Sequence, residues 1–169
     1  MTINPSLQKI DRIRKSLGRW GEDLVVKWLE QEGWEILQRR WSCRYGELDI
    51  IAISANSATV EPTVIFVEVK TRSNGNWDGD GKLTINRAKQ AKIIKSAQVF
   101  LCERPDLANY PCRFDVALVK STKLRQFQEP LAPLSQLQSN IITPEQPIMV
   151  GNYNLTLQDY ISSAFIQID

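Results

Sequence analysis

Glu68 and Lys70 stand two residues apart inside an apolar stretch, which reads FVEVKTR at residues 66–72. Successive side chains of a strand alternate between its two faces, so these two charged groups would share one face. Charged side chains are seldom buried without a partner or a metal ion. Because Glu-x-Lys is also a common spacing in half-exposed strands, an ion pair at a sheet edge would explain this pair of residues unless other features support a site.

A second carboxylate, Asp49, lies in a comparable apolar segment, GELDIIAIS at residues 46–54. If the two segments pair as antiparallel neighbours, Asp49 meets Glu68. Two carboxylates in an apolar setting repel each other and lose solvation unless a proton or a cation lies between them. The hard cation Mg²⁺, or Mn²⁺, suits such oxygen ligands, and Lys70 beside it could orient a water and offset charge that develops on phosphorus. The outline is that of a phosphodiester hydrolase.

Glu22 is a third carboxylate in an unusual position. Residues 16–31, SLGRWGEDLVVKWLEQ, carry apolar side chains at helical spacing, and Gly33 follows where a helix would end. At 100° per residue Glu22 is the only carboxylate in the apolar sector of this helix, among Gly18, Val25, Val26 and Leu29. Glu47, by contrast, shares the parity of Asp49 but begins its segment, so we expect it to be exposed to solvent.

The remaining elements follow from periodicity and turn signals. We expect an α/β fold in which a central mixed sheet is flanked by helices on both faces, because strands that are apolar on both sides need cover on both sides. A glycine-rich loop at 73–81 is expected to be mobile, and the Gln- and Pro-rich segment 126–151 to be an extended or partly disordered insertion. Strands are predicted at 34–41, 46–54, 63–72 and 112–119, and further helices at 83–103 and 157–166.

Composition narrows the class of protein. A length of 169 residues suits a single domain, and the absence of histidine excludes Ser/His/Asp triads and the usual zinc sites. Neither a membrane-spanning apolar run nor a secretory signal is evident, which favours the cytoplasm and argues against a membrane partner. The three cysteines are odd in number and widely spaced, so we expect buried thiols and no disulfide framework.

Basic residues gather in three segments, at 9–15, 39–44 and 82–95, and the last of these contains no acid. Such clusters suit a polyanion, although any one of them would also fit a solvated helix face. In the helix expected at 83–103, Lys92 and Lys95 should point away from the core.

Five segments together resemble a known family. GRWGEDLVVKWLEQEGWEIL, GELDIIA, FVEVKTR, RAKQAKIIKSAQVFL and CRFDV are similar, in this order, to the motifs of the YraN-like uncharacterised bacterial proteins. Those resemble the PD-(D/E)XK nuclease superfamily with its restriction-endonuclease-like fold and, within it, the Holliday junction resolvases. The resemblance covers roughly residues 16–119. It implies that the catalytic residues are Glu22, Asp49, Glu68 and Lys70, and that the metal ligands are Asp49, Glu68 and the carbonyl of Val69.

The sequence therefore predicts a Mg²⁺- or Mn²⁺-dependent nuclease acting on DNA, including branched DNA. A homodimer would let it cut two strands symmetrically. Two alternatives remain: a non-catalytic nucleic-acid-binding module with the same fold, and an adaptor in nucleic-acid processing that uses the Gln- and Pro-rich segment. The residues expected to hold nucleic acid are Arg72, Lys82, Arg87, Lys89, Lys92 and Lys95.

Overall fold

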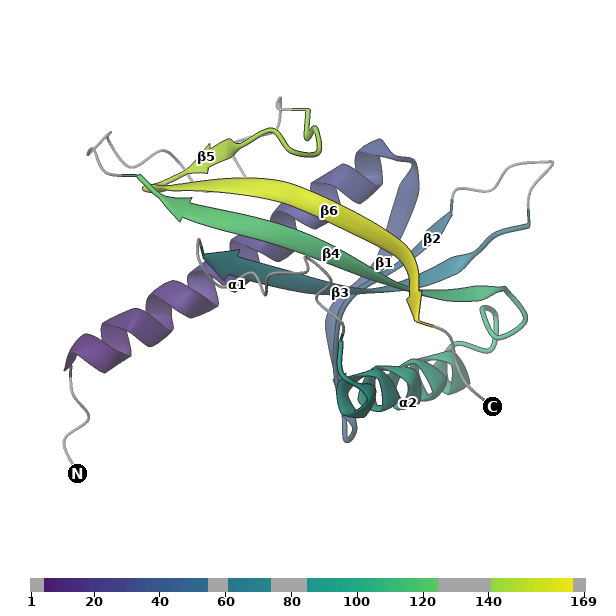
Figure 1. Ribbon diagram of the computed structural model, residues 1–169. Helices are drawn as coiled ribbons and strands as arrows, with labels where there is room; N and C mark the ends of the chain where they lie inside the picture. The colour runs from purple at the N-terminus through teal and green to yellow at the C-terminus, as the bar shows by residue number, and fades with distance from the viewer. Residues whose placement is uncertain (1–4, 55–60, 74–84, 125–140, 166–169) are drawn as a thin grey trace.

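A six-stranded mixed sheet forms the centre of the computed structural model (Figure 1), which describes residues 5–54, 61–73, 85–124 and 141–165. The strand order is β1-β2-β3-β4-β6-β5. β3 and β4 are parallel, with α2 as the crossover between them, and the other neighbours are antiparallel. The elements are α1 (Pro5–Gln31), β1 (Trp34–Cys43), β2 (Gly46–Ser54), β3 (Val64–Ser73), α2 (Arg87–Glu103), β4 (Cys112–Lys123), β5 (Ile148–Val150) and β6 (Tyr153–Phe165).

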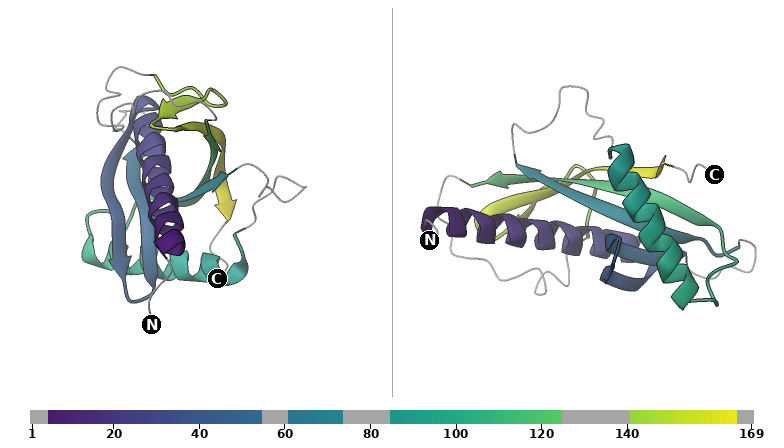
Figure 2. Two further views of the ribbon diagram at one scale, coloured as in Figure 1. Left: turned by 90° about the vertical axis from the view of Figure 1, so that its left-hand side faces the viewer. Right: turned by 90° about the horizontal axis from the view of Figure 1, so that it is seen from below.

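The two helices cover different faces of the sheet, because both faces of its central strands are apolar. On β3, Ile65 and Val67 belong to the cluster that contains α1, while Val64 and Phe66 belong to the cluster that contains α2. α1 runs along the strands and α2 crosses them steeply (Figure 2). The expected α/β architecture with helices on both faces is therefore confirmed.

The ends of the helices follow from local chemistry. Gly33 adopts φ +84 after α1, which is the left-handed conformation expected where a helix ends. α1 begins at Pro5, about three turns before the predicted start at residue 16. At α2, the side chain of Asn86 accepts a hydrogen bond from the backbone N–H of Lys89 and so caps the first turn.

The helix predicted at 157–166 is wrong, because this part of the chain forms strand β6 instead. The apolar residues in this segment recur at intervals of three and four, which is the spacing of a helix. β6, however, pairs with β4 through two register shifts, and Ser163 has φ +51, so the side chains do not alternate regularly. Irregular pairing of this kind gives a strand an apparent helical period.

The segment 126–151 is described only from residue 141 onward, and that part is packed against the fold. Ile142 is buried, and its backbone N–H and carbonyl both bond to the side-chain amide of Gln31. β5 then pairs with β6. The sequence predicts an extended or partly disordered insertion; residues 141–151 pack on the fold, and Ile148–Val150 is extended as β5. Residues 126–140, most of the glycine-rich loop (74–81) and Lys82 lie outside the described residues.

The cysteines differ from the expectation of three buried thiols. Cys102 and Cys112 are exposed and Cys43 is half-buried, and all three are free. In the described part of the chain, no helix is long and apolar enough to cross a membrane.

Candidate active site

Asp49 and Glu68 lie on adjacent antiparallel strands, as the sequence predicts. The backbone pairing of β2 with β3 runs from Ile53↔Val64 to Ile50↔Val67. One residue further, the Asp49 carboxylate takes over the role of a strand carbonyl, because its Oδ2 accepts a hydrogen bond of 2.8 Å from the backbone N–H of Val69. The two strands thus bring the two carboxylates together where their regular pairing ends.

The Asp49 carboxylate is electrostatically unfavourable in this position. Burial and the negative charge of Glu68 raise its pKa from 3.8 to about 7, and Glu22 adds to the rise. The hydrogen bond from Val69 and the charge of Lys89 act in the opposite direction. A carboxyl group with a pKa of about 7 is only partly ionised near neutral pH, and a cation bound beside it would favour the ionised form.

Glu68 is only 5% exposed and is paired with two ammonium groups. Its Oε1 lies 2.6 Å from Nζ of Lys70 and 3.1 Å from Nζ of Lys89. The Lys70 contact joins two residues of the same strand face, whereas Lys89 reaches the carboxylate from α2. Lys89, which the sequence analysis assigned to phosphate binding, is therefore part of the carboxylate cluster.

The oxygen atoms present fit a hard divalent cation. The N–H and carbonyl of one residue in an extended strand point to the same side, so the carbonyl of Val69 faces β2, as its N–H does. Among the described residues, no group of three or more Asp, Glu, Cys or His side chains is placed to hold a metal. The protein would therefore supply two carboxylates, Asp49 and Glu68, and one carbonyl, a small set that suits Mg²⁺ because this ion keeps several waters.

Glu22 lies beside this cluster but has a partner of its own. It forms an ion pair with Arg40 of β1, and the neighbouring pair Asp23–Arg39 also joins α1 to β1. Glu22 is still close enough to Asp49 to raise its pKa. The structure thus brings all four predicted catalytic residues into one region and shows that Glu22 is held by Arg40.

Among the described residues, no ion pair joins Asp49 or Glu68 to the other predicted nucleic-acid contacts, which are Arg72, Arg87, Lys92 and Lys95; Lys82 lies outside the described residues. Arg87, Lys92 and Lys95 are exposed on α2, which confirms that the last two point away from the core. Lys95 lies 5.7 Å from the ring centroid of Tyr45, in the turn between β1 and β2. Arg72 is half-buried near the end of β3. Glu47 is exposed, as expected.

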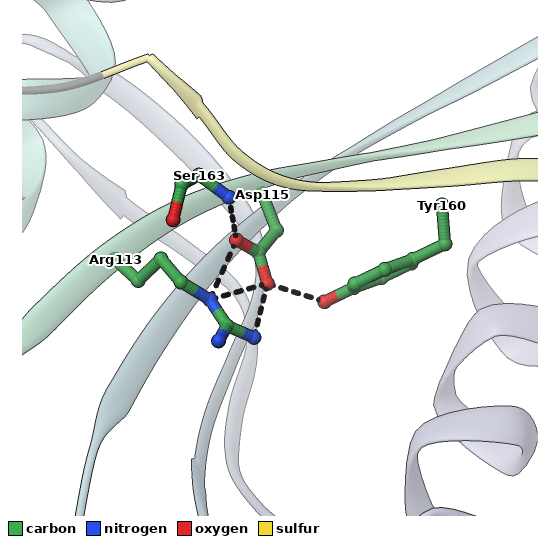
Figure 3. A network of polar contacts seen from close by, with 4 residues as sticks. All are labelled: Arg113, Asp115, Tyr160 and Ser163. Carbon is green, nitrogen blue, oxygen red and sulfur yellow. Dashed lines mark hydrogen bonds and ion pairs between the residues drawn. The ribbon is translucent and has the colours of Figure 1, made fainter.

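Sequence reasoning missed a second buried carboxylate, Asp115 on β4 (Figure 3). Asp115 is fully buried and accepts hydrogen bonds from Arg113, from the Tyr160 hydroxyl at 2.7 Å and from the backbone N–H of Ser163 at 2.8 Å. The signal was available, because CRFDVALV places a charge in an apolar strand just as GELDIIAIS does. With a cation and two further donors, this carboxylate needs no metal, and it ties β6 to β4.

The six-stranded mixed sheet with a helix on each face defines an α/β protein, and this architecture is consistent with a nuclease-like fold. The chain belongs to a family described as Uncharacterised protein family UPF0102, whose profile matches residues 21–119. This confirms the resemblance to the YraN-like proteins.

Relatives in this family are similar over nearly the whole chain. A UPF0102 protein from Trichodesmium erythraeum (strain IMS101) is 46% identical over 168 residues, which cover 94% of this chain and 91% of the relative. A UPF0102 protein from Acaryochloris marina (strain MBIC 11017) is 43% identical over 168 residues, covering 96% and 98%. A third, from Synechocystis sp. (strain ATCC 27184 / PCC 6803 / Kazusa), is 40% identical over 150 residues, covering 88% and 97%.

Proposed function

We propose that this protein is a Mg²⁺-dependent nuclease that hydrolyses phosphodiester bonds of DNA, with branched DNA as the first substrate to test. The observation that carries the proposal is the cluster on β2 and β3. Asp49, whose pKa is raised to about 7, stands beside Glu68, and the ammonium group of Lys70 lies 2.6 Å from Glu68. A protein that only binds nucleic acid has little need for two adjacent, poorly solvated carboxylates.

Each residue of the cluster has a defined part in this proposal. Asp49, Glu68 and the carbonyl of Val69 would hold the ion, which when bound supplies positive charge to the phosphate and makes a water more acidic. Lys70 orients the attacking water and offsets negative charge on the phosphoryl oxygens. Glu22 adds a third carboxylate to the site. It does so either while it keeps its ion pair with Arg40 or after this ion pair breaks.

A non-catalytic nucleic-acid-binding module is the second candidate, and one observation favours it. Glu68 is already neutralised by Lys70 and Lys89, so this carboxylate is satisfied as part of an ion-pair cluster without a metal. In that case the cluster would stabilise the junction of β2, β3 and α2. The protein would bind DNA and would not cleave it.

A nuclease panel separates the two candidates. Linear, flapped and four-way DNA are incubated with the wild-type protein and Mg²⁺ or Mn²⁺, with EDTA as the metal-free control. We expect metal-dependent cleavage that Glu68→Ala abolishes. Glu47→Ala is the matched control, because Glu47 is an exposed carboxylate of the same strand as Asp49 and should leave the rate unchanged.

Cleavage that survives Glu68→Ala would point to a contaminating nuclease. Binding without cleavage of any substrate, with either metal, would establish the binding module instead. Calorimetric titration with Mn²⁺ gives an independent readout, because wild type should bind one ion and Asp49→Ala should lose it.

A further inference from the structure

The first half of α1 extends away from the sheet (Figure 1). Residues 8–12 are all exposed, and Ile10 is 47% exposed, whereas Leu24, Val25 and Leu29 in the second half of the helix are fully buried. We refer to residues 8–19 as the α1 arm. Leu17 still packs against the core cluster, but the exposed turn at residues 8–12 is not explained by packing on the sheet.

The α1 arm is strongly basic. Its charged side chains are one acid, Asp11, and five exposed bases, Lys9, Arg12, Arg14, Lys15 and Arg19. Among the described residues none of these five bases takes part in an ion pair, although Glu22 and Asp23, just beyond the arm, each have an arginine partner. The positive charge of the arm is therefore available to an external anion.

The arm leads into the part of α1 that packs on β3. Gly21 lies so close to this strand that an added Cβ would lie 2.0 Å from Oγ1 of Thr71, whose side chain is on the opposite face of β3 from Glu68 and Lys70. Glu22, the next residue of α1, relates the helix to the candidate site, because its charge acts on Asp49. Lys15 and Glu22 are seven residues apart and therefore lie on the same side of the helix, about two turns from each other. Arg12 and Arg19 form the adjacent row, so a basic strip leads along the arm toward Glu22.

We propose that this strip, Arg12, Lys15 and Arg19 with Lys9 at its end, binds the phosphate backbone of a duplex segment that leaves the active site. The inference rests on the proposed function and names the part of the substrate that this arm would hold. From Glu22 to Lys9 the helix extends about 20 Å at 1.5 Å per residue. At 3.4 Å per base pair this corresponds to roughly six base pairs of flanking duplex.

Charge complementarity favours nucleic acid over the other occupants of an exposed helix. A second copy of this chain would carry the same excess of positive charge on its arm. The exposed apolar surface of the arm is narrow. Ile10 is the apolar side chain that is prominently exposed, while Ile13 and Leu17 are half-buried. The basic strip is the more extensive feature, and a regular row of phosphates matches it.

The test measures binding in EDTA by fluorescence anisotropy, so that no cleavage takes place. Four-way DNA with arms of 4, 8 and 16 base pairs is titrated at several salt concentrations. The arm variant combines Arg12→Gln, Lys15→Gln and Arg19→Gln. The matched control is Arg14→Gln compared with Arg12→Gln alone, because Arg14 has the same charge and exposure but lies roughly 160° away around the helix.

We expect the wild-type protein to bind more tightly as the DNA arms grow from 4 to 8 base pairs, and the arm variant to lose this gain. The slope of log K against log salt should fall by roughly two to three in the arm variant and by about one in Arg12→Gln. Arg14→Gln should leave the slope unchanged. Melting temperatures should stay constant, because all of these side chains are exposed.

An unchanged salt slope and unchanged length dependence in the arm variant would overturn the proposal. So would an arm variant that alters only self-association in sedimentation experiments, since the arm would then contact a second copy. The outcome is separate from that of the nuclease assay. DNA binding that depends on the α1 arm, without cleavage, would refute the nuclease proposal and support the role of the arm. Cleavage together with binding that does not depend on the arm would support the nuclease proposal and refute the role of the arm.

Discussion

Replacing Asp49 with Asn tests the electrostatic reasoning about the site directly. In the folded protein, burial and Glu68 raise the pKa of Asp49 from 3.8 to about 7. Between these two values the folded state holds a proton that the unfolded state releases, so stability falls as pH rises through this window. The whole rise corresponds to about 4 kcal/mol at 1.36 kcal/mol per pKa unit. Asn keeps an oxygen to accept the N–H of Val69 and carries no charge.

We therefore expect Asp49→Asn to be more stable than wild type in the absence of metal. The difference should approach about 4 kcal/mol at pH 8 and fall below about 2 kcal/mol at pH 5, where the folded wild type is protonated at Asp49. Thermal unfolding in EDTA at both pH values measures it, and at pH 8 the melting temperature should rise by at least about 5 °C. Added Mn²⁺ should then stabilise wild type and leave the variant unchanged.

Asp115→Asn is the matched control, since it makes the same change at another buried carboxylate that has a cation partner. It should destabilise the protein by about 2 to 4 kcal/mol, because it breaks the ion pair with Arg113 and disturbs the donors Tyr160 and Ser163. If Asp49→Asn also lowers the melting temperature, equally at pH 5 and pH 8, Asp49 is a structural acceptor and the reasoning about repulsion is refuted.

Three further predictions concern single elements of the site and its support. Lys70→Ala should leave Mn²⁺ affinity in calorimetry nearly intact, because an ammonium group has no lone pair, but should slow cleavage by roughly 10² to 10⁴; loss of metal binding would contradict this. Reversing Lys92 and Lys95 to Glu should lower the salt slope of DNA binding by roughly two or more without changing the melting temperature, whereas an unchanged slope would assign α2 to solvent. Gly21→Ala should cost about 1 to 3 kcal/mol in chemical denaturation, because its Cβ would lie 2.0 Å from Oγ1 of Thr71; an unaltered midpoint would mean that the helix and strand can separate freely.

Much of the site was predictable from local pattern. Asp49 and Glu68 stand out because each is a carboxylate inside an apolar strand, and two such strands in succession pair readily. Glu22 stands out by its angle on the helix, and Gly33 by its place after it. These inferences succeed because the periods of helix and strand are properties of the backbone alone.

Tertiary packing decided the partners of these residues. Lys89 reaches Glu68 from a helix that follows in sequence, and Glu22 meets Arg40 across two elements, so neither contact has a sequence spacing that could reveal it. Asp115 looks like Asp49 in sequence, yet one is satisfied by Arg113 and the other is not.

The C-terminal part shows the same division most clearly. The apolar spacing of residues 157–165 is that of a helix. One edge of β4 pairs with β3 and the other edge is left for this segment, and pairing there satisfies the backbone hydrogen bonds of the segment along its length. The sequence by itself determined which segments are apolar, where α1 ends and which carboxylates lie in buried strands. The tertiary structure decided which cation each carboxylate meets and that the last segment is a strand, because both depend on groups that only the folded chain brings within reach.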